Sequence, residues 1–163
     1  MSTGASIDIR RRLKARAAEL GLDFQQAVLY YAMERFLFRL SQTPWSERLV
    51  VKGAVMLRVW DAAVARPTRD IDFLGRVDNT PEAIRGIVAE CLAVRLDDGL
   101  AFESEIQVVP ITVENRYPGV RAKVAGDLGG GAIRAAARHR NRRCCRARSE
   151  LGRLPGPATR RDS

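Results

Sequence analysis

The stretch Arg66-Pro-Thr-Arg-Asp-Ile-Asp-Phe73 places two acidic residues, Asp70 and Asp72, on either side of one isoleucine. Successive side chains of an extended strand point to opposite faces, so carboxylates two residues apart lie on the same face. Carboxylate oxygens are ligands that Mg²⁺ favours. We therefore expect a strand that begins at Asp70 and holds one Mg²⁺ between the two acids. The alternative is structural: a solvated turn, or ion pairs of these acids with Arg66 and Arg69.

A strand, a glycine and a helix are predicted upstream of this stretch. Residues 48–52 are apolar and β-branched and favour a short buried strand, Gly53 interrupts the pattern, and residues 54–60 favour a helix. A glycine at such a turn lets a phosphate approach the backbone, and the free N–H groups of the helix start attract the anion. Lys52 adds a positive charge beside it. An ordinary strand-to-helix turn explains the same pattern.

Two helices are predicted before residue 45. Asp23 and Gln26 form a capping pair for a helix over residues 24–40, whose broad apolar surface requires a packing partner. Its aromatic residues at helical spacing favour core packing over the stacking of bases. A preceding amphipathic helix over residues 7–20, ended by Gly21, has the apolar positions Ile9, Leu13, Ala17 and Leu20 and a basic opposite face.

The second half of the chain adds one helix and two strands to this pattern. Thr80 as cap and Pro81 in the first turn predict a helix that continues to about residue 94. Residues 105–113 and 120–124 are expected to be antiparallel strands joined by a turn at residues 115–119. The order of elements indicates an α+β protein with a mixed sheet.

Length and composition bound the function classes. A chain of 163 residues, 46% of them hydrophobic, is expected to form one compact domain. No apolar run approaches the roughly 20 residues that cross a bilayer, and the start lacks the pattern of a signal peptide, so we expect a cytoplasmic protein with no membrane contact. Three cysteines, Cys91, Cys144 and Cys145, lack the spacing of a disulfide framework or a zinc site.

The net charge of +9 is concentrated near the C-terminus. Residues 131–163 contain ten arginines and two acids, so residues 1–130 have a net charge of about +1. Alanine, arginine, glycine and proline dominate this segment, and we predict that residues 129–163 lie outside the folded core. One explanation is a disordered basic extension that contacts phosphate nonspecifically. The other is translation out of frame in a GC-rich gene.

The second explanation can be examined with codons. The codons for residues 131–145 can be chosen so that a shift of one base spells ARFALQLDIGIGDAV, which alternates like a strand and contains a Leu-Asp-Ile. We therefore hypothesise a frameshift near residues 129–131. Sequencing the gene tests it, because bases after Gly130 that do not permit this reading would make the segment genuine. The predicted organisation is a helical segment over 1–45, a core over 46–128 and the arginine-rich segment over 129–163.

The motifs resemble those of a known family. Its pattern is Lys-Gly-Gly followed by Arg-Xaa-Ser/Thr-Xaa-Asp-Ile-Asp, and this chain has Lys52-Gly53-Ala54 followed by Arg66-Pro-Thr-Arg-Asp70-Ile-Asp72. Over about residues 20–128 the chain resembles the AbiEii/AbiGii branch of the nucleotidyltransferase superfamily. Members are toxin components of type IV toxin–antitoxin and abortive-infection systems. The implied fold is α+β, a nucleotidyltransferase-fold mixed sheet with N-terminal helices, here incomplete at its C-terminus.

The resemblance implies an activity and a site. Family members transfer a nucleotide from an NTP to an acceptor such as tRNA, and a cognate antitoxin restrains them. Asp70 and Asp72 would be catalytic and would hold Mg²⁺, which orients the α-phosphate and screens charge as pyrophosphate leaves. The implied nucleotide-binding residues are Lys52, Gly53, Ala54, Arg66, Thr68 and Arg69.

Two departures from the family pattern affect the predicted activity. Ala54 replaces the second glycine, and alanine is small enough to be tolerated in this turn. The superfamily also places a third carboxylate on a later strand to activate the nucleophile, and no acid stands in a strand-like context after Asp127. The aspartate of the shifted reading is where that carboxylate is expected. We therefore expect a truncated, inactive toxin; the alternative is a non-enzymatic, basic nucleic-acid-binding protein.

Overall fold

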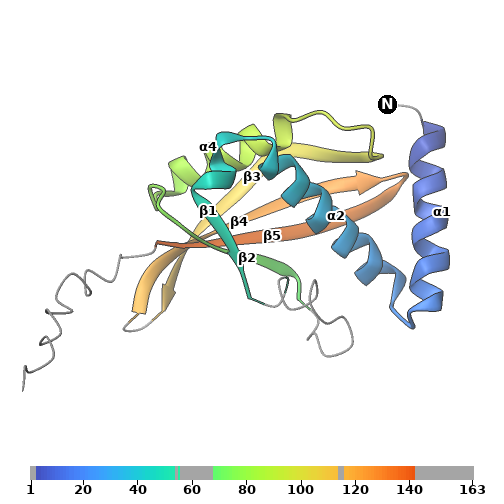
Figure 1. Cartoon of the computed structure of the whole chain (residues 1–163), viewed down its shortest axis with the longest axis horizontal. Helices are drawn as coiled ribbons and strands as arrows, with labels where there is room; N and C mark the ends of the chain where they lie inside the picture. Colours follow the sequence, from blue (N-terminus) through green and yellow to red (C-terminus); the bar gives the residue numbers. More distant parts are fainter. Residues whose placement is uncertain (1–2, 54, 56–67, 114–115, 142–163) are drawn as a thin grey trace, which may run out of the picture.

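The computed structural model describes residues 3–53, 55, 68–113 and 116–141. Within these ranges the chain forms three α-helices, one 3-10 helix and five strands (Figure 1). The helices are α1 (Thr3–Glu19), α2 (Phe24–Ser41), η1 (Pro44–Glu47) and α4 (Pro81–Ala93). The strands are β1 (Leu49–Lys52), β2 (Asp70–Gly75), β3 (Leu100–Val113), β4 (Arg116–Leu128) and β5 (Gly131–Asn141). The α+β class with N-terminal helices is confirmed.

The five strands form one mixed sheet in the order β1-β2-β5-β4-β3. Strands β1 and β2 are antiparallel, β2 and β5 are parallel, and β5, β4 and β3 form an antiparallel meander. Helix α4 belongs to the crossover between β2 and the meander, so the last strand of the meander returns to lie beside β2 (Figure 1). This return gives β2 a neighbour that is more than 60 residues away in sequence.

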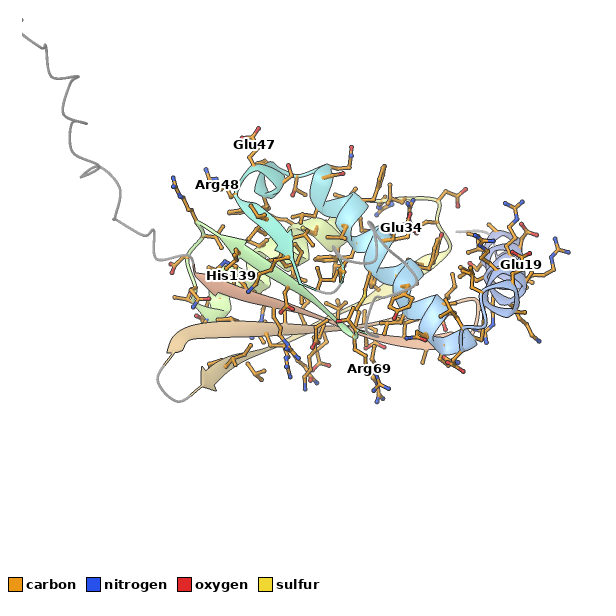
Figure 2. The ribbon with its side chains drawn as sticks, turned by 60° about the horizontal axis from the view of Figure 1, so that its bottom comes forward. Glu19, Glu34, Glu47, Arg48, Arg69 and His139 are labelled. Carbon is orange, nitrogen blue, oxygen red and sulfur yellow. The ribbon has the colours of Figure 1, made fainter. Side chains whose placement is uncertain are left out.

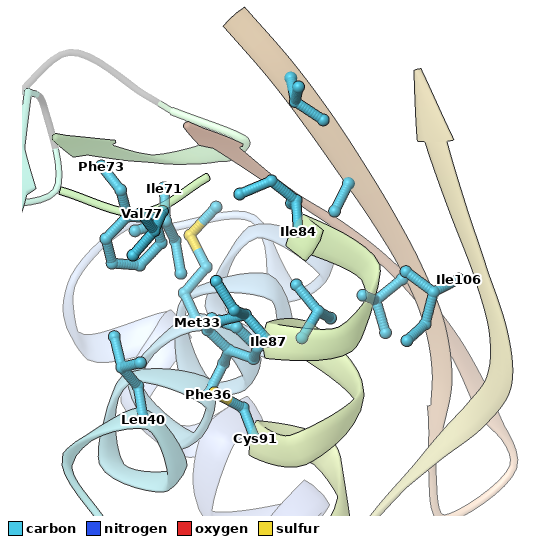
Figure 3. Packing of buried hydrophobic residues seen from close by; sticks show 14 residues of the cluster. Met33, Phe36, Leu40, Ile71, Phe73, Val77, Ile84, Ile87, Cys91 and Ile106 are labelled. Atoms are coloured by element: carbon cyan, nitrogen blue, oxygen red, sulfur yellow. The ribbon is translucent and has the colours of Figure 1, made fainter. Parts of the chain in front are cut away.

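Helices α2 and α4 cover one face of the sheet, and the core lies between them and the strands. Alternate residues of β2, among them Ile71 and Phe73, are buried on this face. Figure 3 shows the packing of Met33, Phe36 and Leu40 from α2 with Ile84, Ile87 and Cys91 from α4 and with Ile71 and Phe73 from β2. Because side chains alternate along a strand, Asp70 and Asp72 lie on the opposite face.

The predicted N-caps of α2 and α4 are confirmed. An Oδ1 atom of Asp23 accepts the backbone N–H of Gln26 at 3.2 Å, and Thr80 Oγ1 accepts the N–H of Ala83 at 3.3 Å. Gly21 ends the first helix with a φ of +62°, a conformation that glycine adopts without strain. Leu20 was predicted on the apolar face of that helix, and this is wrong: α1 ends at Glu19 and Leu20 is 53% exposed.

The strand around residues 48–52 was predicted to be buried, and this is also wrong. Strand β1 forms the edge of the described sheet, and Val50 is 60% exposed on it. An apolar, β-branched run has the same pattern in a central strand and at an edge, so the pattern alone does not distinguish them. The two predicted antiparallel strands are present but longer, with β3 and β4 paired from Leu100↔Leu128 to Val113↔Arg116. The turn predicted at residues 115–119 is therefore wrong, because β4 already begins at Arg116.

The start of the arginine-rich segment differs from the expectation that it lies outside the core. Residues 131–141 form β5, which occupies the middle of the sheet between β2 and β4. Ile133 and His139 are buried on its helix-covered face. The division at residue 128 therefore cuts through the sheet. Residues 142–163 lie outside the described residues, and so does most of the helix predicted over residues 54–60.

Helix α1 closes the end of the sheet at the β4–β5 turn (Figure 1). The Ser6 hydroxyl donates to the carbonyl of Gly99 at 3.2 Å, and an Arg10 Nη1 donates to the carbonyl of Leu128 at 3.2 Å. Among the described residues, the structure contains no helix with the length and apolar character needed to cross a lipid bilayer.

Candidate functional site

The two acids of the motif lie on the face of β2 that faces away from α2 and α4. Asp70 and Asp72 are both partly exposed, and they alternate with buried residues along the strand. Thr68 organises the start of the strand, because its Oγ1 accepts the N–H of Asp70 at 3.3 Å and donates to the Asp70 carbonyl at 3.0 Å. The hydrogen bonds of Thr68 therefore fix the backbone of Asp70, the first residue of the strand.

The glycine turn after β1 lies directly against the acidic strand. Gly53 has a φ of +77°, and a Cβ atom at this position would lie 2.9 Å from Asp72 Oδ2. Side chains rarely adopt this φ, so the turn strongly favours glycine, and the Asp72 carboxylate would have to move to admit a Cβ atom. Lys52 lies opposite Asp72 in the antiparallel β1–β2 ladder. The structure thus brings the turn and the acids together, although they are about twenty residues apart in the chain.

Two arginines from the meander complete this part of the sheet. Arg138 of β5 lies opposite Asp72 in the parallel β2–β5 ladder, and its Nη2 forms an ion pair with Asp70 Oδ2. Arg121 lies opposite Arg138 on β4, and its Nη2 is 4.0 Å from the same oxygen. Side-chain exposures of 18% for Asp70 and 31% for Arg138 mean that the pair is partly shielded from water.

Sequence reasoning missed both arginines. It named Arg66 and Arg69 as ion-pair partners because they are close in sequence, whereas the partner in the structure is Arg138. The available signal was the alternation of Arg134, Ala136 and Arg138, which places all three on one face of a strand. Arg66 and Ala54 lie outside the described residues, and their predicted roles stay predictions.

The remaining predicted residues line a cavity at the start of β2. Thr68 and exposed Arg69 border a space of about 540 Å³ between the first turn of α2 and the start of β5. Figure 2 shows Arg69 beside the start of β2 and His139 near the far end of β5. The other lining residues are Asp23, Gln25, Gln26, Val28, Leu29, Ala132, Ile133 and Arg134. The cavity is therefore next to the acids but separate from the Gly53 turn.

The titratable groups with shifted pKa values lie on the helix-covered side. Burial raises the pKa of the Cys91 thiol to about 11, so this thiol stays protonated at neutral pH and is a poor nucleophile. Burial lowers the pKa of His139, whose Nδ1 lies 3.1 Å from Asn79 Oδ1. A neutral, enclosed imidazole on this side does not reach the open face of the acids.

The donor set around Asp70 and Asp72 does not fit the predicted magnesium site. Magnesium requires oxygen ligands in near-octahedral arrangement and strongly prefers anionic surroundings. Here an oxygen of Asp70 is occupied by the Arg138 guanidinium, with Arg121 as a second positive charge nearby. Across the part of the chain that the structure describes, no group of three or more His, Cys, Asp or Glu side chains is placed to hold a metal ion.

Comparison with family models agrees with the family that the motifs resemble. Residues 35–138 match the family model described as nucleotidyl transferase AbiEii toxin, type IV TA system. The match covers more than half of the chain, including the glycine turn, both acids and Arg138. No curated protein and no solved structure matches the chain. Nucleotidyltransferases of this family form the toxin half of a toxin–antitoxin pair, and this chain belongs to the AbiEii nucleotidyl transferase toxin family.

Proposed function

We propose that the protein is a nucleotidyltransferase-type toxin that binds an NTP at the Gly53 turn but does not transfer the nucleotide. In an active relative we expect the acceptor to be an RNA such as tRNA. Membership of a toxin–antitoxin family implies a cognate antitoxin as partner. In this proposal Lys52 and Gly53 contact the triphosphate, and Asp70 and Asp72 lie near its α-phosphate. Ala54, Arg66, Thr68 and Arg69 are the further proposed nucleotide contacts.

The contact between Gly53 and Asp72 carries the proposal. Gly53, at a φ of +77°, lets the turn after β1 lie so close to β2 that a Cβ atom would be 2.9 Å from Asp72 Oδ2, and a glycine turn beside a strand end is a common phosphate-binding element. Lys52 adds a cation in register with the acid. The Nε atoms of Arg121 and Arg138 are buried and have no hydrogen-bond partner among the described residues. Phosphate oxygens are natural acceptors for such donors.

The absence of transfer is proposed from the chemistry at position 138. Activation of an attacking hydroxyl requires a group that accepts its proton. A guanidinium has no acceptor lone pair and stays protonated at all relevant pH values, so Arg138 cannot serve as that base. The family generally uses a divalent metal ion, and Asp70 and Asp72 are the residues that would contribute to binding Mg²⁺. Paired with Arg138, Asp70 does not complete such a site.

Replacing Gly53 by valine is expected to weaken NTP binding at least about tenfold. The added side chain would meet Asp72 at the 2.9 Å contact and would strain the positive φ of +77°, so it would distort the turn at which we propose the triphosphate binds. Equilibrium binding of a fluorescent NTP analogue to wild type and variant measures the effect.

Gly130→Ala is the matched control. Gly130 also has a positive φ, of +84°, but a Cβ there meets nothing within 4 Å. This variant has the same kind of backbone strain far from the proposed phosphate contact, so its NTP affinity should stay near the wild-type value. Equal affinities of all three proteins would remove the support for an NTP site at this turn.

Incubation of the full chain with labelled NTPs and total tRNA should give bound nucleotide without transfer. The reason is the missing proton acceptor at position 138. Label that becomes covalently attached to RNA or protein, and that remains after denaturation, would contradict the proposed inactivity while leaving the NTP site intact.

A non-enzymatic nucleic-acid-binding protein is the second candidate, and the open face of the sheet favours it. Arg121 and Lys123 of β4 and Arg134 and Arg138 of β5 share this face by register. Helix α1 is a weaker candidate surface, because its Arg11 and Arg12 pair with Asp8 and its Arg16 pairs with Glu19. RNA affinity that falls steeply with salt, together with undetectable NTP binding, would favour this function.

A further inference from the structure

We propose that Arg138 occupies the position of a metal ligand beside Asp70 and Asp72 and closes this site to divalent cations. A carboxylate at position 138 would then open it. The inference rests on the placement of the proposed function at this site. Beyond that function, the loss of metal binding is assigned to one side chain, Arg138. This assignment can be tested in the absence of nucleotide.

The register of the two parallel strands defines the position. Asp72 and Arg138 are direct Cα partners across the β2–β5 ladder, and Asp70 pairs with Ala136. Neighbouring strands lie about 4.8 Å apart, and paired residues project from the same face of the sheet. A side chain at position 138 therefore starts beside Asp72, and the long Arg138 side chain extends to Asp70. The two acids and Arg138 therefore share the open face of two adjacent strands, with Arg138 paired to Asp70 and Asp72 Oδ2 lying beside Gly53.

The charge at position 138 decides what this part of the open face can bind. Asp70 and Asp72 supply two negative charges, and Arg138 and Arg121 place two positive charges against them. A divalent cation would have to displace the Arg138 guanidinium from Asp70 Oδ2 and then remain beside both arginines. A guanidinium stays protonated in proteins, so Arg138 does not make room for the cation by losing its charge. The ion pair therefore takes the place of the cation.

Binding of Mn²⁺ alone to the full-length protein tests the proposal. Mn²⁺ is an oxygen-preferring ion whose binding is followed by electron paramagnetic resonance of the free ion or by calorimetry. Arg138→Asp should bind Mn²⁺ at least about tenfold more tightly than wild type, because affinity for hard cations rises with the number of charged ligands. Its Tm should also rise with added Mn²⁺, whereas that of wild type should not.

Arg134→Asp is the matched control, with the same change of charge on the same strand and face. Arg134 lies opposite Ala125 on β4 and outside the segment of β5 that pairs with β2. It should leave Mn²⁺ affinity at the wild-type value. A gain of equal size in both variants would mean that net charge, and not position 138, controls binding, and would overturn the proposal.

Arg138→Gln keeps the test decisive if the aspartate variant fails to fold. This neutral side chain removes the guanidinium from Asp70 without adding a carboxylate, so Mn²⁺ binding should lie between those of wild type and Arg138→Asp. Wild-type protein that binds Mn²⁺ as tightly as either variant would overturn the proposal, as would a folded variant that gains nothing. The titrations contain no NTP, so failure here is distinguishable from failure of the proposed nucleotide site.

Discussion

Replacing Arg39 by alanine is expected to lower the free energy of unfolding by about 3–5 kcal/mol, because it leaves a buried carboxylate without its partner. Arg39 of α2 forms a two-pronged ion pair with Asp98, at 2.6 Å and 3.1 Å, with side-chain exposures of 3% and 6%. Asp98 Oδ1 also accepts the N–H of Leu100, and Tyr31 donates to the Asp98 carbonyl. The pair thus joins α2 to the loop that enters β3.

Chemical denaturation of wild type, Arg39→Ala and Arg16→Ala measures this effect. Arg16 also pairs with an acid, Glu19, but both side chains are more than 60% exposed, so its removal should cost less than about 1 kcal/mol. Similar losses for the two variants would show that the Arg39–Asp98 pair is not buried as described. Such a result would also weaken the placement of α2 over the sheet.

Replacing Ala137 by proline is expected to destabilise the fold by at least about 3 kcal/mol. Ala137 lies in the middle of β5, between Ile71 of β2 and Ala122 of β4. Proline removes a backbone N–H and is excluded from the middle of sheets. Far-ultraviolet circular dichroism during denaturation should reveal an earlier transition or no folded state.

Ala132→Pro provides the comparison for this substitution. Ala132 is exposed and belongs to the same strand, but it precedes the residues that pair with β2 and lies beside the β4–β5 turn. Its replacement should cost clearly less. Equal effects at both positions would be inconsistent with β5 as a central strand.

Local patterns were sufficient to predict most elements and the acidic half of the site. Alternation around Ile71 placed Asp70 and Asp72 on one face, and side-chain caps located the starts of α2 and α4. Each of these features is decided by residues within a few positions of one another. The same holds for Gly53, whose place after a short strand predicted a turn.

The central strand could not be predicted from composition. Residues 131–141 are rich in alanine and arginine, which have little β-propensity, and this composition indicated a segment outside the core. Strand β5 forms because β4 pairs with it through a tight turn and β2 accepts it on the other side. Small alanines fit where helices pack closely over the sheet, as Ala137 does. Tertiary pairing overrides propensity here.

The identity of the partner of Asp70 depends on the same long-range pairing. Arg66 and Arg69 are near in sequence, but Arg138, 68 residues away, makes the ion pair. Only the order of strands brings it there. The magnesium site was predicted from two acids on one face of a strand. It does not fit because Arg138, the side chain next to them on β5, is positively charged.

A double-mutant cycle between Asp70 and Arg138 tests the central claim most directly. Free energies of unfolding are measured for wild type, Asp70→Asn, Arg138→Gln and the double variant. A contact between these partly shielded side chains predicts a coupling energy of about 1 kcal/mol. Single effects that add to within about 0.3 kcal/mol would contradict it, because side chains that do not touch are additive.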